Sequence, residues 1–335
     1  MKVLITGGTG FVGSHAARTL SDQGHEVRLL IRDAAKTERV LGALGIRDVE
    51  LVHGDVTDPS EMATAAAGCD AAVHTAAMVA LHRSQAAAAH ATNTAAAAAV
   101  LGAALQAGCD PVVHISSVSV LQQHDGRVDL ASPLRDGSTG YSASKVDCEW
   151  MARGMQAAGL PLTTLYPSGV IGPDAPGLSV LHTAAQTWIR AMPMISSGVN
   201  LVDVRDLAAM IAAALTPGEG PRRLMAGGTF TPWSELVDEI ERLRGRRIRR
   251  YPAPGAVMRG LGRVVDLTHL PLPIDFELTH ETMTEASRAV PCDSSESERL
   301  LGVTPRPIVD TLVDTYRWLV SQGALAPEEI GNMLA

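Results

Sequence analysis

The stretch KVLITGGTGFVG, residues 2–13, decides the fold of this chain. It begins with a short apolar run, Val3–Thr6, which is typical of a buried parallel strand and is ended by glycines. Phe11–Gln23 follows with the spacing of a helix. A glycine loop between a strand and a helix lets the backbone approach a pyrophosphate, and free N–H groups at the helix N-terminus attract that anion. The stretch therefore predicts a nucleotide-binding loop, with an ordinary turn as the alternative interpretation.

Strand and helix patterns alternate further along the chain. GCDAAVHTAA, residues 68–77, and GCDPVVHISS, residues 108–117, share glycine, cysteine, aspartate, valine and histidine at the same offsets. Two βα units of one sheet explain this echo, because each segment follows an alanine-rich helical pattern and contains a short apolar run. The alternation predicts an α/β fold with a Rossmann-type doubly wound parallel sheet. We also expect strands at 25–31, 49–53 and 163–166 and helices at 86–107 and 141–158.

The pattern becomes less regular after residue 170, which indicates a smaller, discontinuous second domain towards the C-terminus. We expect the nucleotide-binding domain to comprise residues 1–170 and 198–221. The second domain would comprise residues 171–197 and 222–304, and a C-terminal helix and tail would occupy 305–335.

Composition excludes several classes of protein. The chain has 335 residues, of which 46% are hydrophobic and 19% are charged, so it can build a large core. Its formal net charge of −8 argues against a nucleic-acid partner, because a general nucleic-acid binder needs a basic surface. Apolar runs fall short of the roughly 18–20 residues of a membrane span, so we expect no integral membrane segment. Four cysteines without metal-type spacing predict reduced thiols, no metal site and a cytoplasmic location.

The residues after the second expected strand bear on the choice of cofactor. A carboxylate at the end of that strand would accept a hydrogen bond from a ribose 2′-hydroxyl, but Ile31 stands there. Arg32 follows at once and Lys36 comes one helical turn later, and such cations bind a 2′-phosphate. We therefore predict NADP (NADPH) as the preferred cofactor. The alternatives are NAD, with Asp33 as the ribose acceptor, and a solvated basic turn.

A tyrosine and a lysine with helical spacing are the candidate catalytic pair. Tyr141 and Lys145 lie four residues apart, on one face of the expected helix. A nearby lysine cation lowers the pKa of a tyrosine, so the phenol can exchange a proton near neutral pH. Ser117, at the end of an expected strand, would hydrogen-bond the same carbonyl oxygen. Ser116 is its rival, since adjacent strand residues face opposite ways.

These motifs, in this order, resemble the extended short-chain dehydrogenase/reductase superfamily, of the NAD-dependent epimerase/dehydratase-like kind. TGGTGFVG matches its TGxxGxxG loop, and YSASK matches its YxxxK helix. ISS resembles the strand end with the catalytic serine, and YPSGVIGP resembles the loop beside the nicotinamide. The resemblance covers residues 1–215 well and is looser beyond them. The chain looks most similar to the dihydroflavonol-reductase and 3β-hydroxysteroid-dehydrogenase branch.

The resemblance implies roles for individual residues. Ser117, Tyr141 and Lys145 would form a catalytic triad, and Tyr141 and Lys145 would also contact the cofactor. The other implied cofactor contacts are Gly7, Gly10, Phe11, Val12, Gly13, Asp55, Val56, Ala76, Ala77 and Pro167. Asn93 is a candidate for the asparagine of a water-linked proton relay. Tyr166 stands where many relatives have an arginine, which puts any role of that arginine in doubt.

The resemblance implies an NADP-dependent oxidoreductase that interconverts a ketone or aldehyde and an alcohol on a small, apolar substrate. A nucleotide-sugar epimerase or dehydratase with tightly held NAD is the first alternative. Such relatives usually have an arginine where this chain has Ile195–Gly198, although the arginine-rich segment 242–250 keeps the alternative open. An NADP-sensing regulator of the NmrA-like kind is the second alternative, and it typically lacks the Tyr–Lys pair. Relatives often dimerise through the helices at 86–107 and 141–158, so we expect a homodimer.

Overall fold

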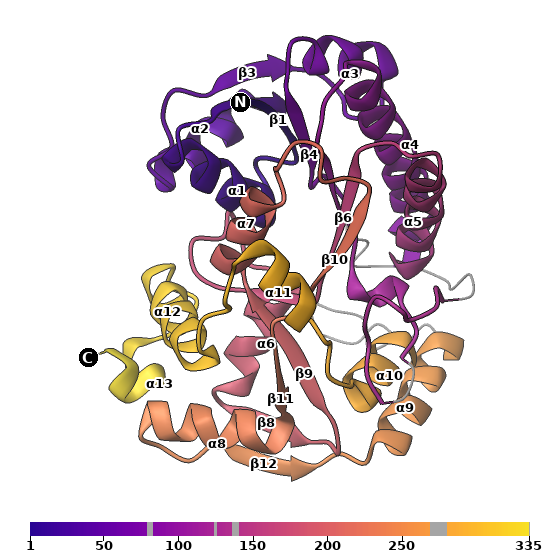
Figure 1. The fold of residues 1–335 in the computed structure, drawn as a ribbon. Helices are drawn as coiled ribbons and strands as arrows, with labels where there is room; N and C mark the ends of the chain where they lie inside the picture. Colours follow the sequence, from indigo (N-terminus) through magenta and orange to yellow (C-terminus); the bar gives the residue numbers. More distant parts are fainter. Residues whose placement is uncertain (79–82, 124–125, 136–140, 269–279, 335) are drawn as a thin grey trace.

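The computed structural model of the protein describes residues 1–78, 83–123, 126–135, 141–268 and 280–334. A seven-stranded parallel sheet with helices on both faces forms the larger part of the molecule (Figure 1). A smaller group of helices and two small sheets lies at one end of it. The predicted α/β fold with a Rossmann-type, doubly wound sheet is confirmed.

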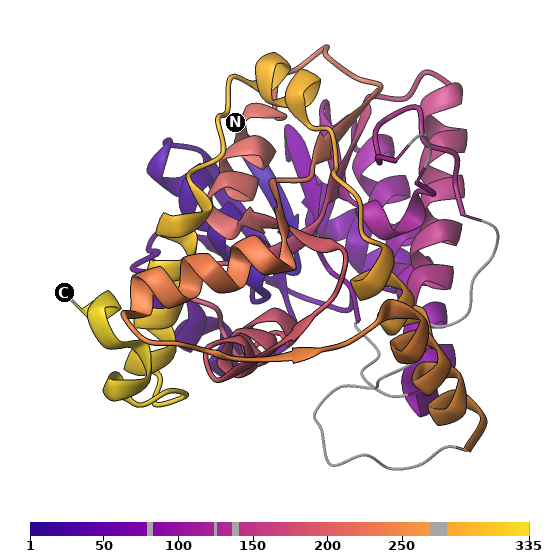
Figure 2. The ribbon, with the colours of Figure 1, turned by 90° about the horizontal axis from the view of Figure 1, so that it is seen from below.

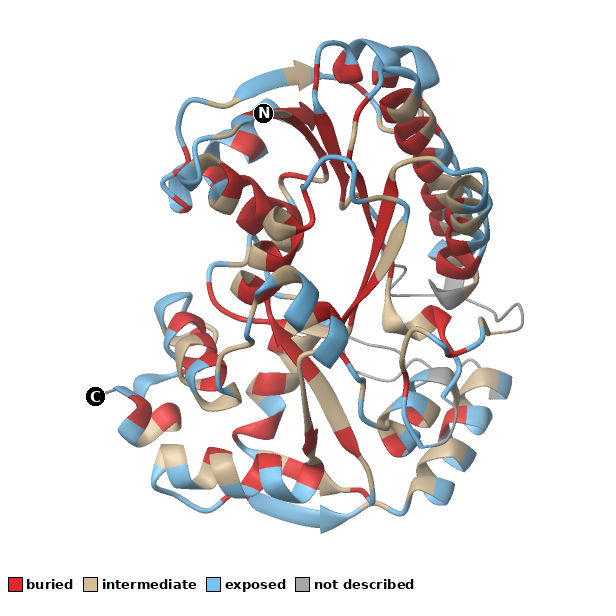
Figure 3. Ribbon diagram, viewed as in Figure 1, coloured by how far each residue is buried: buried red, intermediate tan, exposed pale blue. Residues whose placement is uncertain are grey.

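The large sheet has the strand order β10-β6-β5-β4-β1-β2-β3, and every neighbouring pair is parallel. Its strands are β1 (Lys2–Thr6), β2 (Glu26–Ile31), β3 (Glu50–His53), β4 (Ala71–His74), β5 (Val112–Ile115), β6 (Leu162–Pro167) and β10 (Arg222–Ala226). The inner strands are almost entirely buried, whereas β3 at the edge is largely exposed (Figure 3). Burial on both faces explains why these strands read as apolar runs.

Helices cover the two faces of the large sheet. One face packs against α1 (Phe11–Asp22), α2 (Ala34–Ala43) and α7 (Val204–Ala213). The other packs against α3 (Pro59–Ala66), α4 (Arg83–Gln106) and α5 (Tyr141–Ala157). Seven of the sixteen buried residues of this second core are alanines, so α4 and α5 approach each other and the sheet closely. Their bounds agree with the predicted helices to within three residues.

The smaller part surrounds two short sheets. One contains β7 (Gly169–Ile171), β9 (Gly198–Asp203) and β11 (Thr229–Pro232), and the other contains β8 (Ala191–Met194) and β12 (Arg249–Pro252). The remaining helical segments are α6 (Val180–Trp188), α8 (Trp233–Arg244), α9 (Gly255–Thr268), α10 (His280–Arg288), α11 (Ser295–Leu301), α12 (Ile308–Ser321), α13 (Pro327–Ile330), η1 (Val118–Val120) and η2 (Gly331–Leu334). Figure 2 shows α8 and β12 crossing this part between α12 at one side and α9 at the other.

Aromatic rings join the smaller part to the start of α1. The Phe11 ring lies 5.2 Å from His182 of α6, and the His182 ring lies 4.8 Å from Trp318 of α12, measured between centroids. The smaller part therefore contacts the end of the large sheet at which the glycine loop lies. The expected domain ranges stay a prediction. Two strands differ from those ranges. β10, within the range expected for the second domain, belongs to the large sheet, and β9, within the range expected for the nucleotide-binding domain, belongs to a small sheet.

Candidate active site

The predicted site residues gather at the carboxyl edge of the large sheet. Parallel strands all end at the same edge, so residues that follow them in different parts of the sequence lie along one line. The strand order reverses between β1 and β4, and open α/β sheets bind ligands at such a point. The residues in the loops and strand ends of this edge are Gly7, Gly10, Arg32, Asp55, Val56, Ala76, Ala77, Ser117 and Pro167, and Gly13 lies in the first turn of α1.

The glycine loop has a backbone that larger residues cannot adopt. Gly7 has a φ of +78°, and a Cβ atom there would lie 2.6 Å from the backbone nitrogen of Ala76. A Cβ atom on Gly13 would lie 2.5 Å from Thr75 Oγ1. Thr75 Oγ1 in turn donates to the carbonyl oxygen of Thr6 at 2.8 Å. The glycines therefore allow α1, the loop and the end of β4 to pack against one another.

The first turn of α1 fits an anion. Its N-cap residue, Gly10, provides no side-chain acceptor, so no cap blocks the amide groups of that turn. The N–H groups of Phe11, Val12 and Gly13 lack intrahelical acceptors because of their position in the helix. Together with the φ of Gly7, this geometry fits the pyrophosphate of a dinucleotide.

The end of β2 presents exposed cations. Arg32 and Lys36 are exposed, and neither has an ion-pair partner among the described residues. Asp33 instead forms the N-cap of α2, where its carboxylate accepts from the Lys36 backbone N–H at 2.9 Å. The carbonyl oxygen of Arg32 lies 2.9 Å from His53 Nε2, which ties this turn to β3. The two cations are thus available to a ligand, whereas the Asp33 carboxylate already accepts a hydrogen bond.

Asp55 and Val56 follow β3 at the same edge. The Thr57 N–H and hydroxyl both donate to Asp55 Oδ1 at 2.8 Å, and these bonds lower the pKa of the Asp55 carboxyl. The positive charge of Arg32 acts in the same direction. Val56 is half-buried against the core under α3. Both residues lie at this edge of the sheet, and their contact with an adenine stays a prediction.

Two adjacent serines at the end of β5 have different partners. Ser116 is buried, and its Oγ donates to Glu149 Oε2 at 3.0 Å. Ser117 is half-buried and lies at the start of η1, where its Oγ accepts from the Ser119 N–H and Oγ at 3.1 and 2.9 Å. An oxygen that accepts these bonds still has its own proton to donate. The arrangement favours Ser117 over Ser116 as the residue that faces a ligand.

Lys145 lies in the first turns of α5, against the same strand end. Its side chain is 6% exposed, and its Nζ lies 3.3 Å from the carbonyl oxygen of Ile115, the last residue of β5. Tyr141 is the first residue of α5, one helical turn before Lys145, and its side chain lies outside the described residues. Pro167, at the end of β6, is buried beside this edge.

The sequence analysis missed Glu149, a fully buried carboxylate on α5. It follows Lys145 by four residues, so the helical spacing that selected Tyr141 and Lys145 also reaches it. The signal in the sequence is that Glu149 is a charged residue on the same helix face as Tyr141 and Lys145. Thr75 was missed as well, because nothing in its own sequence context shows how closely it meets the glycine loop.

Asn93 is buried beside the start of α5. Its Oδ1 accepts from the Met78 N–H at 2.7 Å, and its Nδ2 donates to the Met78 carbonyl and to Ser144 Oγ at 3.0 and 3.1 Å. Asn93 therefore ties the loop after β4 to α5. Its part in a proton relay stays a prediction.

Two histidines are buried in the sheet below the site. His74 and His114 are paired in register on β4 and β5, and their stacked rings have centroids 5.4 Å apart. Thr6 Oγ1 lies 2.8 Å from His74 Nδ1, whereas neither nitrogen of His114 has a hydrogen-bond partner in the described structure. Burial lowers the pKa of His74 to about 3 and that of His114 well below its usual value. Both rings are therefore neutral, as expected for core residues.

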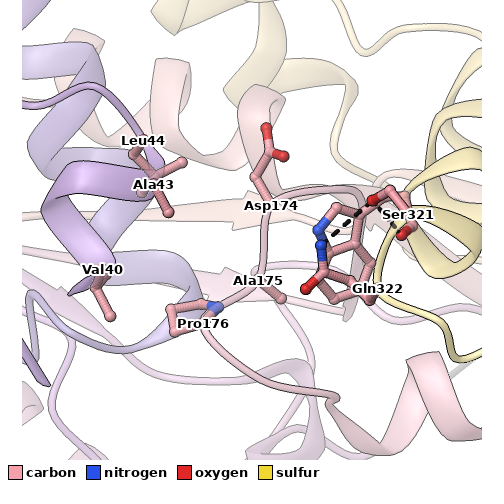
Figure 4. Close-up of a pocket in the computed structure, with 9 residues that line it drawn as sticks. Val40, Ala43, Leu44, Asp174, Ala175, Pro176, Ser321 and Gln322 are labelled. Carbon is pink, nitrogen blue, oxygen red and sulfur yellow. Dashed lines mark hydrogen bonds between the residues drawn. The ribbon is translucent and has the colours of Figure 1, made fainter.

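A hollow of about 190 Å³ lies away from these residues, between α2, the segment Asp174–Pro176 and α12 (Figure 4). None of the predicted site residues lines it. The arginine-rich segment 242–250 runs from the end of α8 into β12. Acidic residues of α8 partly neutralise it, because Arg242 pairs with Glu239, and Arg250 pairs with Asp238 and Glu241. These pairs agree with a solvated surface. No helix in the described parts of the chain is long and apolar enough to span a membrane.

Comparisons with known proteins identify the family of the chain. The sequence model of the NAD dependent epimerase/dehydratase family matches residues 3–227. A Synechocystis sp. protein provisionally named a dihydroflavonol 4-reductase is 26% identical over 332 residues, covering 95% of this chain and 94% of that protein. The crystal structure of gox2253 has a TM-score of 0.81 and 26% identity, covering 96% of this chain and 99% of that one. A UDP-glucose-4-epimerase from Stenotrophomonas maltophila, solved with NAD, has a TM-score of 0.75 and 23% identity, covering 97% and 99%.

Proposed function

Because the chain belongs to the NAD-dependent epimerase/dehydratase family, we propose that it is an NADP-dependent oxidoreductase. In this proposal it interconverts a ketone or aldehyde and an alcohol on a small, apolar substrate. The observation that carries it is the placement of Ser117, Lys145 and the start of α5 together at the carboxyl ends of β5 and β6. The similarity to a reductase over 95% of the chain gives independent support.

The side chains have complementary tasks in this reaction. Ser117 would donate its free proton to the carbonyl oxygen and so polarise it. Tyr141 would protonate the same oxygen as it becomes an alkoxide, and accept that proton in the reverse direction. Lys145, one helical turn away, would lower the pKa of the Tyr141 phenol by its positive charge. When bound, the dinucleotide supplies or accepts the hydride.

The preference for NADP rests on the turn after β2. Arg32 and Lys36 are exposed and have no ion-pair partners in the described structure, while Asp33 caps α2. A guanidinium binds phosphate oxygens through two parallel hydrogen bonds, and each charge-assisted bond contributes about 1.5–3 kcal/mol. A 2′-phosphate would therefore be recognised here, whereas Asp33 Oδ1 already accepts the bond that caps α2.

The epimerase alternative has less support from the side chains. At the position where such relatives usually have an arginine, Ser197 donates its hydroxyl to the carbonyl oxygen of Ala286 at 2.7 Å. The arginines of segment 242–250 that pair with α8 are partly neutralised. A sugar diphosphate would thus lack its expected cationic partner at Ser197.

We propose a homodimer through α4 and α5. Trp150 of α5 is 61% exposed, which is unusual for so large an apolar side chain. His90 of α4 and Asp147 of α5 pair at 2.8 Å on the same outer side. Burial of Trp150 against a second copy would remove its apolar surface from water.

Titration of the purified, dialysed protein with NADPH and NADH tests the cofactor proposal, after an assay for nucleotide that is already bound. We expect NADPH to bind at least tenfold more tightly, about 1.4 kcal/mol. Arg32→Gln should weaken NADPH binding about 10–100-fold and leave NADH binding almost unchanged. Arg47→Gln is the matched control, because Arg47 is also exposed but precedes β3, at the opposite edge of the sheet.

A panel of ketones and aldehydes with NADPH then tests the reaction. Reduction of apolar members supports the oxidoreductase. Copurified NAD that resists dialysis, with turnover of sugar nucleotides, would replace the proposal by the epimerase. NADPH binding without turnover of any carbonyl or sugar would favour the regulatory protein.

A further inference from the structure

A buried carboxylate on α5 connects the strand ends that carry the predicted site. Glu149 is 0% exposed, and three side chains donate to it. Ser116 Oγ donates to Oε2 at 3.0 Å, Tyr166 Oη donates to Oε1 at 2.5 Å, and Arg153 Nε donates to Oε1 at 2.9 Å. Both carboxylate oxygens are therefore engaged.

Two of the three partners lie next to a predicted site residue. Ser116 directly precedes Ser117 at the end of β5. Tyr166 directly precedes Pro167 at the end of β6. Glu149 follows Lys145 by one helical turn on α5. The three elements that bear the predicted triad and the nicotinamide-side proline thus meet at one carboxylate.

The chemistry of these bonds makes the junction rigid. Burial, and next the Glu149 charge, raise the pKa of Tyr166 well above its usual value, so its phenol stays protonated and donates. Arg153 compensates the charge of Glu149, and its own pKa is raised by its hydrogen bond to that residue. A buried carboxylate that lost these donors would bear an uncompensated desolvation cost. Movement of either strand end relative to α5 is therefore opposed.

We propose that Glu149 is a positioning residue, which fixes the ends of β5 and β6 relative to α5 and so sets the distance between Ser117 and the Tyr141–Lys145 helix. It does not touch substrate, and it acts through Ser116 and Tyr166. The inference rests on the proposed function only for its catalytic consequence. That Glu149 joins β5, β6 and α5 follows from the hydrogen bonds themselves.

Gln156 provides a matched control on the same helix. Its Nε2 donates to the carbonyl oxygens of Leu162 and Arg222 at 3.0 Å each and to Thr164 Oγ1 at 3.2 Å. It therefore also ties α5 to β6 and β10, through three hydrogen bonds. Leu162 and Arg222 begin their strands, however, so this junction lies at the opposite edge from the site.

Ser116→Ala and Tyr166→Phe each remove one donor and leave the charge of Glu149 in place. We expect each variant to lower kcat about 10-fold to 100-fold, because small misplacements of catalytic groups cost that much. The KM for the carbonyl substrate and the Kd for NADPH should change less than about twofold. Gln156→Ala should lower Tm about as much as Ser116→Ala and Tyr166→Phe do, without lowering kcat. Equal kcat losses in Gln156→Ala and Tyr166→Phe, or unchanged kcat in both donor variants, would overturn the proposal.

Hydrogen exchange separates this proposal from the proposed function. The Ser116 N–H donates to the Leu165 carbonyl oxygen at 2.9 Å, so its exchange reports on the junction of β5 and β6. We expect exchange at least about threefold faster in Tyr166→Phe and Glu149→Gln, and unchanged in Gln156→Ala. If the wild-type protein reduces no carbonyl, the oxidoreductase proposal fails, and this exchange still decides the role of Glu149. Unchanged exchange in both variants would refute it.

Discussion

The stacked histidines below the site predict a specific loss of stability in acid. His74 and His114 are held neutral inside the sheet, and no described acceptor compensates a proton on His114. On unfolding, both rings enter water, where histidine titrates near 6.5. Below that pH the unfolded chain binds protons that the folded chain excludes, so the free energy of unfolding must fall as the pH falls.

The size of the effect follows from the pKa of His74. That pKa is about 3 in the folded protein against 6.5 in its usual state, mainly because of burial and next because of the Lys145 charge. Between these two values each pH unit removes about 1.4 kcal/mol of stability. From pH 6.5 to pH 5, His74 alone should therefore cost about 2 kcal/mol. His114 adds to the loss in the same direction.

Urea unfolding at a series of pH values between 5 and 7 measures this slope. His74→Asn keeps an acceptor near Thr6 and removes the titrating ring. It should therefore reduce the slope most towards pH 5, where the reduction approaches about 1.4 kcal/mol per pH unit. Val73→Ala is the control, because it opens a cavity on the same strand and should lower stability equally at every pH. A His74→Asn slope equal to that of the wild type would refute the reasoning, since it would mean that the folded protein accepts the proton.

Three further predictions concern the site and the proposed dimer. Gly13→Ala should destabilise the protein by about 1–3 kcal/mol and weaken dinucleotide binding, because the new Cβ meets Thr75. Thermal shift with and without NADPH measures both effects, and unchanged binding would contradict the assignment of the loop. Ser117→Ala should lower kcat about 10²–10³-fold at unchanged NADPH affinity in steady-state assays, and an undiminished kcat would exclude it as the carbonyl donor. Trp150→Ser should shift the protein to a monomer in sedimentation velocity, whereas an unchanged mass would place the interface elsewhere.

The spacing of apolar residues and glycines along the chain predicts much of the fold and the sheet edge at which the predicted site residues lie. The apolar run Val3–Thr6 could only pack as a strand between helices, and the glycines after it allow the close approach between Gly13 and Thr75. Because the strands of such a sheet are parallel, the residues that follow them share one edge. Arg32 and Lys36 could therefore be placed at the same edge as the glycine loop from their positions in the sequence alone.

Long-range side-chain junctions were beyond such reasoning. Two partners of Glu149, Ser116 and Tyr166, are 33 and 17 residues away, at the ends of β5 and β6. Which serine of the pair turns towards α5 depends on the pleat at the strand end. The sequence left Ser116 and Ser117 as rivals for that reason. Likewise, the sequence shows only that Tyr166 replaces an arginine found in many relatives. In the structure its hydroxyl donates to Glu149, as Arg153 does.

The same limit explains why the substrate is harder to predict than the chemistry. The predicted catalytic groups follow β5 or lie on α5, which covers the same sheet, so their positions follow from a repeated βα pattern. The smaller part is assembled from separated segments. It meets the end of the glycine loop through Phe11, His182 and Trp318, which come from three distant places in the chain. His182 also lies 2.8 Å from the Gly172 carbonyl oxygen through its Nε2, so it joins this contact to the loop after β7. The contact between the two parts therefore depends on packing among distant segments, which local sequence spacing does not predict.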